Sequence, residues 1–448
     1  MLTREVYRNW IAAICTILLI PIYVEAATAV ATSAPTAPPQ QTQQDLVVTT
    51  DRPDARYNLG DTVIFTARLV NLPDQELRYT IQENHHKEVE KGRLAFKDGV
   101  ATVTATFQTP GFLFLRINPP HELVNENRRR AGRAGAVCAP DKLLPSLPVP
   151  EDFNAFWDGK KAIMNDIPFN AQLTLLENQS NDKIEVYSMT LDSYNGTKAH
   201  GFLAKPKGNT ACPAIMFTHG AGVRSFSAQR VQTWAGYGAI AIEVSAHDIP
   251  NDQPKEFYTE LAEGKLKGYS RFGCDDRETS YFLRMFLSCY QAARLVTSLP
   301  EWDGQRFVVY GSSQGGGQAL ATAYLCDKVS AFFANVSALC DHAGREAGRP
   351  AGWPRWVSYQ NNGMADARQL EASRYFDGVN FARFIKAKAL MSCGFIDTTC
   401  PPSSVYAAFN MLTGEKQMVE MPTAAHETPP MITETATAFA KRQLGLTE

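Results

Sequence analysis

The segment from residue 306 to residue 322 has the sequence RFVVYGSSQGGGQALAT, which joins two different patterns. Residues 307–310 form a short apolar run of β-branched and aromatic residues, typical of a strand, and residues 318–325 are apolar with a helix-forming composition. The motif G-x-S-x-G between them centres on Ser313. Its two glycines lack the Cβ atoms that would collide where a strand meets a helix in a tight turn. We therefore predict a nucleophile elbow with Ser313 at its tip.

Size and charge limit the classes of protein that the chain can be. Its 448 residues are too many for one ordinary domain and predict two folded domains after a processed end. Lys and Arg number 44 against 46 Asp and Glu, so the net charge is only -2. A chain with this balance has no basic surface for nucleic acid. We expect a neutral small molecule or a polysaccharide as its partner.

The first 29 residues have the order of a secretory signal peptide. Arg4 and Arg8 precede an apolar run at residues 10–24, and small residues follow up to Ala29, where we expect cleavage. The run is shorter than the ~20 residues that a transmembrane helix needs, although an uncleaved anchor is the alternative. We therefore expect a secreted or periplasmic protein with no stable membrane insertion after signal removal. Eight of the nine cysteines follow the signal, and no disulfide pairing is assigned to them.

The rest of the chain divides into four segments. Residues 30–45 have no apolar periodicity and are predicted to be a flexible linker. Residues 46–118 contain short alternating segments between turn residues, which predicts a small immunoglobulin-like β-sandwich. Residues 119–150, with three consecutive arginines, are expected to be a loosely structured connector arm. In residues 151–448 strand and helix patterns alternate, which indicates a mainly parallel sheet covered on both faces.

The elements expected in this last segment follow a simple order, from a leading hairpin to a closing helix. Active sites of such sheets lie beyond the carboxyl ends of the strands, so the loops there are searched for catalytic residues. The expected strands are residues 184–189, 201–205, 214–217, 239–242, 307–310, 331–336, 389–393 and 417–421, and the expected helices are residues 228–234, 281–299, 318–325 and 433–443.

A serine hydroxyl is a poor nucleophile by itself and needs a general base that an acid orients. On this kind of fold the expected chain order is serine, acid, histidine. His426 follows the last strand and is the predicted base, since His342 follows the nucleophile too closely. Asp397, one strand before His426, is favoured as the acid. Asp341 also follows a strand after Ser313 and remains the alternative.

An oxyanion formed at this serine requires two preorganised N–H donors. The backbone N–H of Gln314, directly after the nucleophile, is the first. The second is expected from the glycine-rich loop at residues 218–222, where we assign Ala221. His219 in the same loop is expected to be structural. Aromatic side chains are predicted to line a sugar subsite, or alternatively to pack a lid-like excursion at residues 247–280 onto the body; they are Tyr269, Phe272, Trp353 and Trp356.

Several separate blocks of the sequence resemble the acetyl xylan esterases and cephalosporin C deacetylases of carbohydrate esterase family seven. The resemblance covers about residues 145–448 and implies an α/β-hydrolase with Ser313, Asp397 and His426 as its triad. It also implies oxyanion donors at Gln314 and at Ala221, the residue after His-Gly. The blocks are residues 145–157, 219–220, 298–317, 339–341, 375–382, 397–403, 407–410 and 426–427.

The sequence departs from this family at several places. The family's Arg-Gly-Gln stretch is here Ser245-Ala246-His247, and the usual Tyr after His-Gly is Ala221. Typical members also lack an export signal and an N-terminal β domain. These differences concern the hexameric assembly, the aromatic wall of the pocket and cephalosporin as a substrate, and they leave ester hydrolysis intact.

The expectation is therefore an exported serine esterase that removes acetyl groups from xylan-derived or related sugars through an acetyl-Ser313 intermediate. Its partner would be an acetylated oligo- or polysaccharide, and the sequence is compatible with a homo-oligomer. No organic cofactor or metal is implied. The adjacent His85 and His86 could suggest a metal, but they have no third ligand nearby and are expected to be exposed turn residues. The alternatives are a serine peptidase of the prolyl oligopeptidase type and a non-catalytic binding protein on a hydrolase scaffold.

Overall fold

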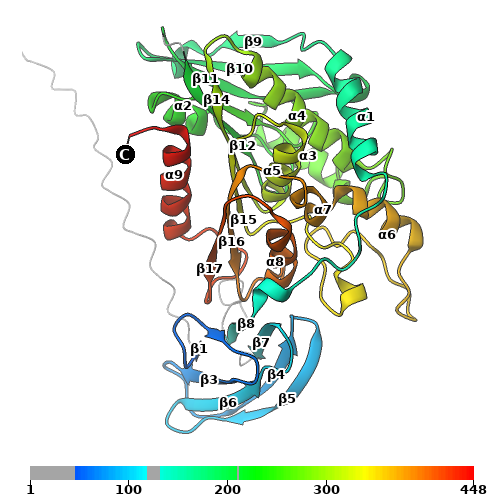
Figure 1. The fold of residues 1–448 in the computed structure, drawn as a ribbon. Coiled ribbons are helices and arrows are strands. Elements are labelled where there is room, and N and C mark those ends of the chain that lie inside the picture. Colours follow the sequence, from blue (N-terminus) through cyan, green and yellow to red (C-terminus); the bar gives the residue numbers. More distant parts are fainter. Residues whose placement is uncertain (1–45, 119–131, 209–210, 448) are drawn as a thin grey trace, which may run out of the picture. The chain divides into compact units, whose positions relative to one another are not determined.

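The computed structural model describes residues 46–118, 132–208 and 211–447. The predicted signal peptide and linker, and residues 119–131 of the predicted connector, lie outside the described residues. From Gln44 onward the chain forms one compact unit, whose elements are labelled in Figure 1. No helix among the described residues is long and apolar enough to cross a membrane.

An N-terminal β-rich domain contains two sheets, with the strand orders β1-β3-β6 and β2-β8-β7-β4-β5. Its third strand shows why the segment folds this way, since alternate residues from Val63 to Leu69 are buried while most of their neighbours are not. Both sheets contribute to one apolar core, as the sequence predicted. The strands are β1 Leu46–Thr50, β2 Arg56–Tyr57, β3 Thr62–Leu69, β4 Glu76–Glu83, β5 Lys87–Ala95, β6 Val100–Thr106, β7 Gly111–Ile117 and β8 Arg133–Cys138.

Strand β8 corrects the predicted connector arm, which was expected to be loosely structured from residue 119 to residue 150. It pairs antiparallel with β7 along six residues, from Arg133 opposite Arg116 to Cys138 opposite Gly111. Its sequence, Arg-Ala-Gly-Ala-Val-Cys, consists mostly of small residues and lacks the alternation of large apolar and polar side chains that marks a half-exposed strand. The β-rich domain therefore extends to Cys138, and only the residues after it form an arm.

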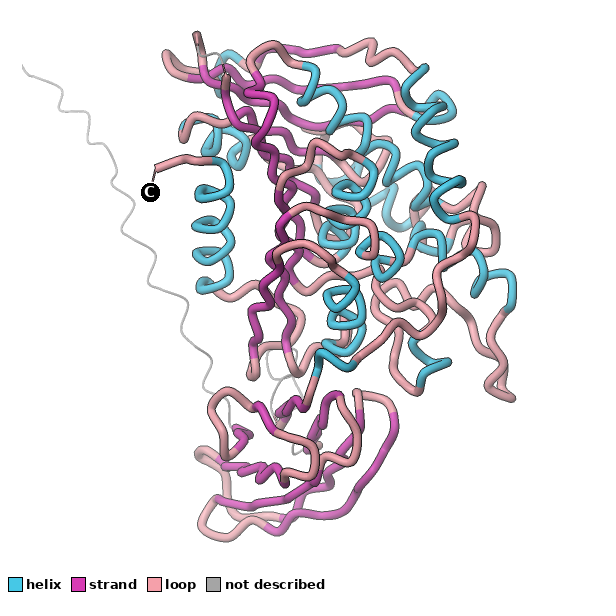
Figure 2. The backbone as a smooth tube through the Cα atoms, viewed as in Figure 1, coloured by secondary structure: helices cyan, strands magenta, loops and turns pink. Residues whose placement is uncertain are grey.

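The catalytic domain predicted from residue 151 contains a nine-stranded sheet, in the order β17-β16-β15-β14-β12-β13-β11-β10-β9. Neighbouring strands from β13 to β17 run parallel, and β9, β10 and β11 are antiparallel additions at one edge. Helices cover both faces, with α2 and α9 on one side and α4, α5, α7 and α8 on the other (Figure 1). The tube in Figure 2 shows the same layering of helices around the strands. The expected α/β arrangement is confirmed.

Most predicted elements are present with shifted ends. Helix α1 was not among the expected helices, and its buried aromatic residues lie at helical spacing. The strands are β9 Gln172–Leu175, β10 Ile184–Asp192, β11 Lys198–Pro206, β12 Cys212–Thr218, β13 Ile240–Val244, β14 Trp302–Ser312, β15 Ala331–Asn335, β16 Lys388–Gly394 and β17 Lys416–Met421. The helices are α1 Phe153–Asp166, α2 Gln229–Gly236, α3 Lys255–Glu263, α4 Tyr281–Ser298, α5 Gln314–Leu325, α6 Ala367–Ser373, α7 Gly378–Ala382, α8 Pro402–Met411 and α9 Pro430–Leu444.

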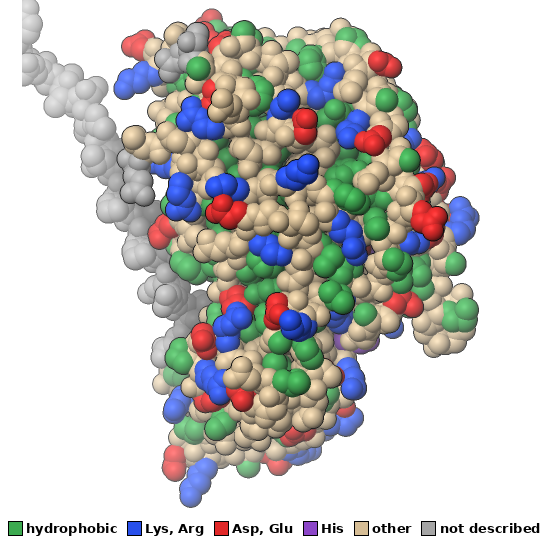
Figure 3. Space-filling model, in the orientation of Figure 1, with side chains coloured by type: hydrophobic (Ala, Val, Ile, Leu, Met, Phe, Trp, Pro, Cys, Tyr) green, Lys and Arg blue, Asp and Glu red, His purple; other side chains and the backbone are tan. Residues whose placement is uncertain are grey.

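The surface and the cysteines add two observations. On the face shown in Figure 3, basic and acidic side chains are interspersed, in keeping with the small net charge. All eight cysteines of the described part are buried free thiols, which are Cys138, Cys212, Cys274, Cys289, Cys326, Cys340, Cys393 and Cys400.

Candidate active site

Ser313 lies in the turn between β14 and α5, with φ 57° and ψ -122°. Positive φ is uncommon for a residue with a side chain and is found where the surrounding structure enforces it. The two glycines of the motif allow neighbouring backbone segments to pack closely around this turn. A Cβ on Gly311 would lie 2.0 Å from the carbonyl oxygen of Gly315, and a Cβ on Gly315 would lie 2.5 Å from that of Thr218. The structure thus contains the tight turn that the motif predicts.

His426 connects Ser313 to Asp397. Its Nε2 atom lies 2.9 Å from Ser313 Oγ, and its Nδ1 atom lies 2.8 Å from Asp397 Oδ2. In the tautomer whose Nδ1–H donates to the carboxylate, Nε2 is the acceptor that faces the serine. We refer to these three residues as the Ser–His–Asp array. It is assembled from the loops after β14, β16 and β17, at the carboxyl ends of parallel strands.

Two further backbone groups fix the carboxylate of Asp397, which is fully buried. Its second oxygen, Oδ1, accepts the N–H groups of Thr399 at 2.7 Å and of Cys400 at 2.9 Å. The carboxylate therefore has a defined rotamer, with one oxygen left for the imidazole. Sequence reasoning missed these donors, although an Asp that accepts backbone N–H groups two and three residues further on is a common local turn.

Asp341, the alternative acid, has other partners. Its Oδ2 atom lies 2.7 Å from Arg349 Nη2 and accepts the Ser146 hydroxyl at 2.9 Å, while Oδ1 accepts the Ser146 N–H at 2.8 Å. Asp377 accepts the N–H groups of Asp341 and His342. Burial, with the nearby charge of Asp341, raises the pKa of Asp377 to about 7. The structure brings Asp397 to His426, and it holds Asp341 in an ion pair with Arg349 and in hydrogen bonds with Ser146 of the arm.

The other histidines among the described residues lie outside the array. Burial lowers the pKa of both His219 and His342 to about 3, so both imidazoles are neutral near pH 7. His219 accepts the Ala246 N–H at 3.0 Å, in keeping with the structural role expected for it. His85 differs from the expected exposed turn residue, because it is partly buried with its ring stacked on Phe114 at 4.2 Å.

The glycine-rich loop at residues 218–222 passes beside Ser313. A Cβ on Gly220 would lie 3.7 Å from Ser313 Cβ, so the backbone that continues to the half-buried Ala221 borders the serine. The Gln314 N–H opens α5, where first-turn amides have no partner within the helix. Tyr269 joins the start of α5 to the glycine-rich loop. Its hydroxyl donates to Gln314 Oε1 at 2.6 Å and accepts the Gly222 N–H at 3.3 Å.

The aromatic residues predicted for a sugar subsite separate by burial. Trp356 is fully buried, stacks on Phe376 and donates its indole N–H to the Cys274 carbonyl oxygen at 2.7 Å. Its side chain packs the core, so we leave it out of the subsite. Phe272 is 41 % exposed, and Trp353 is partly buried with its ring centroid 6.4 Å from that of Tyr269.

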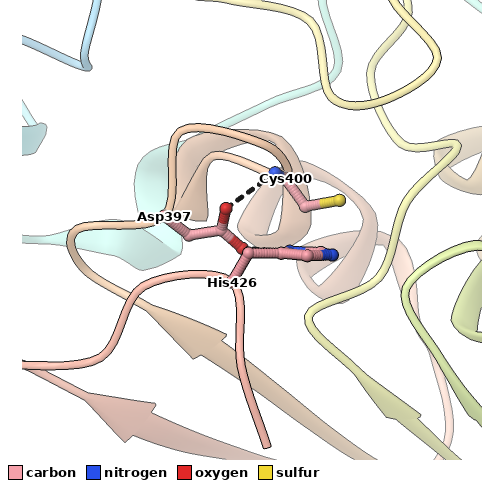
Figure 4. Close-up of side chains that lie close together, drawn as sticks. All are labelled: Asp397, Cys400 and His426. Carbon is pink, nitrogen blue, oxygen red and sulfur yellow. Dashed lines mark hydrogen bonds and ion pairs between the residues drawn. The ribbon is translucent and has the colours of Figure 1, made fainter. Parts of the chain in front are cut away.

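Asp397, Cys400 and His426 also have ligand atoms of the kinds that bind metal ions, all within 4.8 Å of one another. Figure 4 shows the three side chains together, with the Cys400 backbone N–H donating a hydrogen bond to the Asp397 carboxylate. Both oxygens of Asp397 and both ring nitrogens of His426 already have hydrogen-bond partners. Burial raises the pKa of the Cys400 thiol, which disfavours the thiolate that a metal needs. The geometry therefore favours a proton-transfer array over a metal centre.

The sequence profile of the family described as Acetyl xylan esterase (AXE1) matches residues 142–443, more than half of the chain. The chain belongs to the acetyl xylan esterase family. This confirms the resemblance inferred from the sequence blocks. The matched residues contain the whole Ser–His–Asp array and begin after the β-rich domain.

Three individual proteins are similar to this chain and agree with this assignment. The acetyl esterase Axe7A of Xylanibacter ruminicola is 29% identical over 373 residues, which are 82% of this chain and 83% of that protein. The acetyl xylan esterase from Paenibacillus sp. R4 superposes with a TM-score of 0.59 at 29% identity, covering 68% of this chain and 98% of its own. Acetyl Xylan Esterase 1 from Thermoanaerobacterium sp. JW/SL YS485 gives a TM-score of 0.58 at 25% identity and covers 68% and 97%.

Proposed function

We propose that this member of the acetyl xylan esterase family is an exported serine esterase that removes acetyl groups from xylan-derived or related sugars. The observation that carries the proposal is the Ser–His–Asp array, with 2.9 Å between Ser313 Oγ and His426 Nε2 and 2.8 Å between His426 Nδ1 and Asp397 Oδ2. These distances are within the range that proton transfer between a nucleophile and its base requires.

In the proposed reaction, Ser313 Oγ attacks the acetyl carbonyl carbon while His426 takes the hydroxyl proton. The tetrahedral intermediate then collapses, and the sugar oxygen leaves with the proton from His426. Water next attacks the carbonyl carbon of the acetyl-serine while His426 takes its proton. The second tetrahedral intermediate then collapses, His426 returns the proton to Ser313 Oγ, and acetate leaves. Asp397 holds the imidazole in its working tautomer and stabilises the imidazolium in both half-reactions.

The proposed oxyanion donors are the N–H groups of Gln314 and Ala221. Gln314 opens α5, and Gly220 brings the neighbouring loop to within contact of Ser313, which supports both assignments. Loss of one such donor typically costs about 3 to 4 kcal/mol of transition-state stabilisation. Tyr269 joins the two donor segments through its hydroxyl and keeps their spacing fixed.

The proposed substrate is an acetylated oligo- or polysaccharide, bound by the enzyme after secretion or in the periplasm, with no nucleic acid involved. Phe272 and Trp353 are the predicted aromatic residues that retain exposed surface, and they form the proposed face for a sugar ring. Tyr269 is only 7% exposed and its hydroxyl is held between Gln314 and Gly222, so it is left out of this face. Aromatic faces stack on sugar rings through their apolar C–H surfaces. A homo-oligomer is compatible with this arrangement.

The experiment that tests the function measures acetate release from a panel of acetylated xylo-oligosaccharides, together with kcat/KM for acetate to octanoate esters of one alcohol. Acetate esters are expected to be preferred, with each added methylene costing about 1 to 3 kcal/mol. A profile that rises toward octanoate would indicate a lipase-like esterase, and preferential amide cleavage would indicate a peptidase.

The matched variants are Ser313→Ala and Ser312→Ala. Ser313→Ala is expected to lower kcat by roughly 10⁴- to 10⁶-fold. Ser312 accepts the Asn335 amide at 2.9 Å instead of facing His426, so its variant should stay active. The opposite ranking would contradict the assignment of the nucleophile, and a wild type without esterase activity would favour a binding protein.

A further inference from the structure

The acid loop, residues 395–401, and the base loop, residues 422–429, are packed directly on each other. A Cβ on Gly394, at the end of β16, would lie 2.4 Å from the Ala424 carbonyl oxygen. The Ile396 N–H donates to the same oxygen at 3.2 Å, and the Phe395 N–H donates to the Met421 oxygen at 3.0 Å. Asp397 and His426 are therefore carried by two loops that are joined through their backbones.

One side chain of β7, in the β-rich domain, contacts both of these loops. Phe114 is 2% exposed and forms a separate apolar cluster with Ile396 and Ala425. These two residues directly precede Asp397 and His426 in the sequence. Because packing at Phe114 restrains the backbone next to both the acid and the base, it bears on the distance between them.

A second contact reaches the same acid loop from β7 and β8. The rings of Phe112 and Phe395 meet edge to face, with centroids 5.3 Å apart, and both side chains are fully buried. Gly135 permits the close approach, since a Cβ there would lie 2.6 Å from the Phe395 carbonyl oxygen. At the periphery, Arg56 Nη1 lies 2.5 Å from Glu420 Oε2 at the end of β17. Strands β7 and β8 of the β-rich domain thus pack closely against the acid loop.

We propose that the β-rich domain is a positioning element of the active site, acting through Phe114 on the acid and base loops. The inference rests on the serine mechanism proposed above. The solved acetyl xylan esterases are covered almost completely by two thirds of this chain, and the matched family profile begins at residue 142, so the domain lies outside the matched profile. Its catalytic value follows from geometry, because a displacement of about 1 Å in a catalytic group can cost ~10²-fold in rate.

The test compares three variants of the full chain. Phe114→Ala removes the contact, Phe114→Leu restores apolar volume, and Phe107→Ala is the matched control. Phe107 is also 2% exposed, but it packs only within the core of the β-rich domain. Phe114→Ala is expected to lower kcat by about 10- to 100-fold with KM unchanged, because the loss falls on alignment and not on substrate binding. Phe114→Leu should recover most of the activity, and Phe107→Ala should retain it.

Hydrogen exchange supplies a readout that does not depend on activity. In Phe114→Ala the amides of Thr399 and Cys400, which donate to Asp397, should exchange faster than in the wild type. In Phe107→Ala they should exchange at the wild-type rate. Equal losses of protection and activity in the two Ala variants would overturn the proposal, since the effect would then be general destabilisation of the domain. Unchanged kcat and exchange in a folded Phe114→Ala variant would also overturn it.

A double-mutant cycle separates this inference from the mechanism on which it rests. If Phe114 acts through the acid, Phe114→Ala should lower kcat by less than about 3-fold in an Asp397→Asn background, because the aligned pair is already lost. The same fold loss in both backgrounds would overturn the positioning role while leaving the triad intact. A normal kcat for Asp397→Asn alone would instead contradict the proposed mechanism.

Discussion

Two buried aspartates follow neighbouring strands of the same sheet, and they serve the molecule differently. Asp397, after β16, presents one oxygen to the imidazole of His426 and the other to two backbone N–H groups. Asp341, after β15, faces Arg349 and Ser146. A buried carboxylate next to a guanidinium forms an ion pair, whereas one beside an imidazole and amide donors orients a base. The chemical partner, and not the position after a strand, decides the role.

The largest expected effect concerns activity at the first aspartate. Asp397→Asn should lower kcat/KM by about 10⁴-fold, because the amide no longer selects the tautomer in which Nε2 accepts the serine proton. The matched change Asp341→Asn should lower it by less than about 10-fold, since Asp341 does not contact His426. Steady-state kinetics on an acetate ester decides the ranking. A larger loss in the Asp341 variant would reverse the comparison.

Stability should show the opposite ranking. Asp341→Asn leaves the Arg349 guanidinium, whose side chain is only 7% exposed, without its carboxylate. Breaking one side of a buried ion pair costs about 3 to 5 kcal/mol in free energy of unfolding. Urea denaturation of both variants measures this. The comparison fails if Asp397→Asn is destabilised as strongly as Asp341→Asn.

A smaller effect is expected on the nucleophile side of the array. Tyr269→Phe keeps the ring but removes the hydroxyl that joins Gln314 to the Gly222 N–H. Leaving such buried groups without a partner typically costs about 1 to 3 kcal/mol, so kcat should fall by roughly 10-fold. Phe272→Leu, at an exposed ring of the proposed sugar face, is the control and should affect KM more than kcat. Wild-type kcat in Tyr269→Phe would show that the loop keeps its spacing without this bridge.

A pH dependence is expected next to Asp341. Burial lowers the pKa of His342 to about 3 in the folded protein, from about 6.5 for an exposed imidazole. Between these values the unfolded chain binds the extra proton, so this stability is complete above pH ~6.5 and is lost as the pH falls, by about 1.4 kcal/mol per pH unit. His342→Gln should reduce the slope of unfolding free energy against pH between pH 4 and 6 by about that amount. Above pH ~7 the two curves should run parallel, and an unchanged slope at low pH would contradict the buried neutral histidine.

The sequence was sufficient wherever the local pattern and the tertiary environment agree. The apolar run of β14 and the tight turn at Ser313 depend on short-range chemistry, and the structure contains them. Strand β8 was missed because its small residues have no period. Trp356 was misplaced for a related reason, since a sequence shows an aromatic ring but not the side on which it packs.

The sequence alone could not decide which of the two aspartates is the acid, and for a different reason. Both satisfy the expected order after Ser313, and the deciding partners, Arg349 and Ser146, are eight residues after Asp341 and 195 residues before it. Such contacts are set by tertiary packing, which no local pattern records. The packing of Phe114 on Ile396 and Ala425 is of the same kind.

The eight buried thiols have a practical consequence for how this protein is inactivated when it unfolds. While it is folded, each sulfur is shielded from solvent, and burial raises the pKa of thiols such as Cys289 and Cys393, which suppresses the thiolate that oxidants attack. Unfolding removes both protections at once, and eight unpaired cysteines become free to form mismatched disulfides. Heat inactivation in aerated buffer should therefore be irreversible and set by the unfolding rate, whereas a reducing agent should restore recovery on cooling.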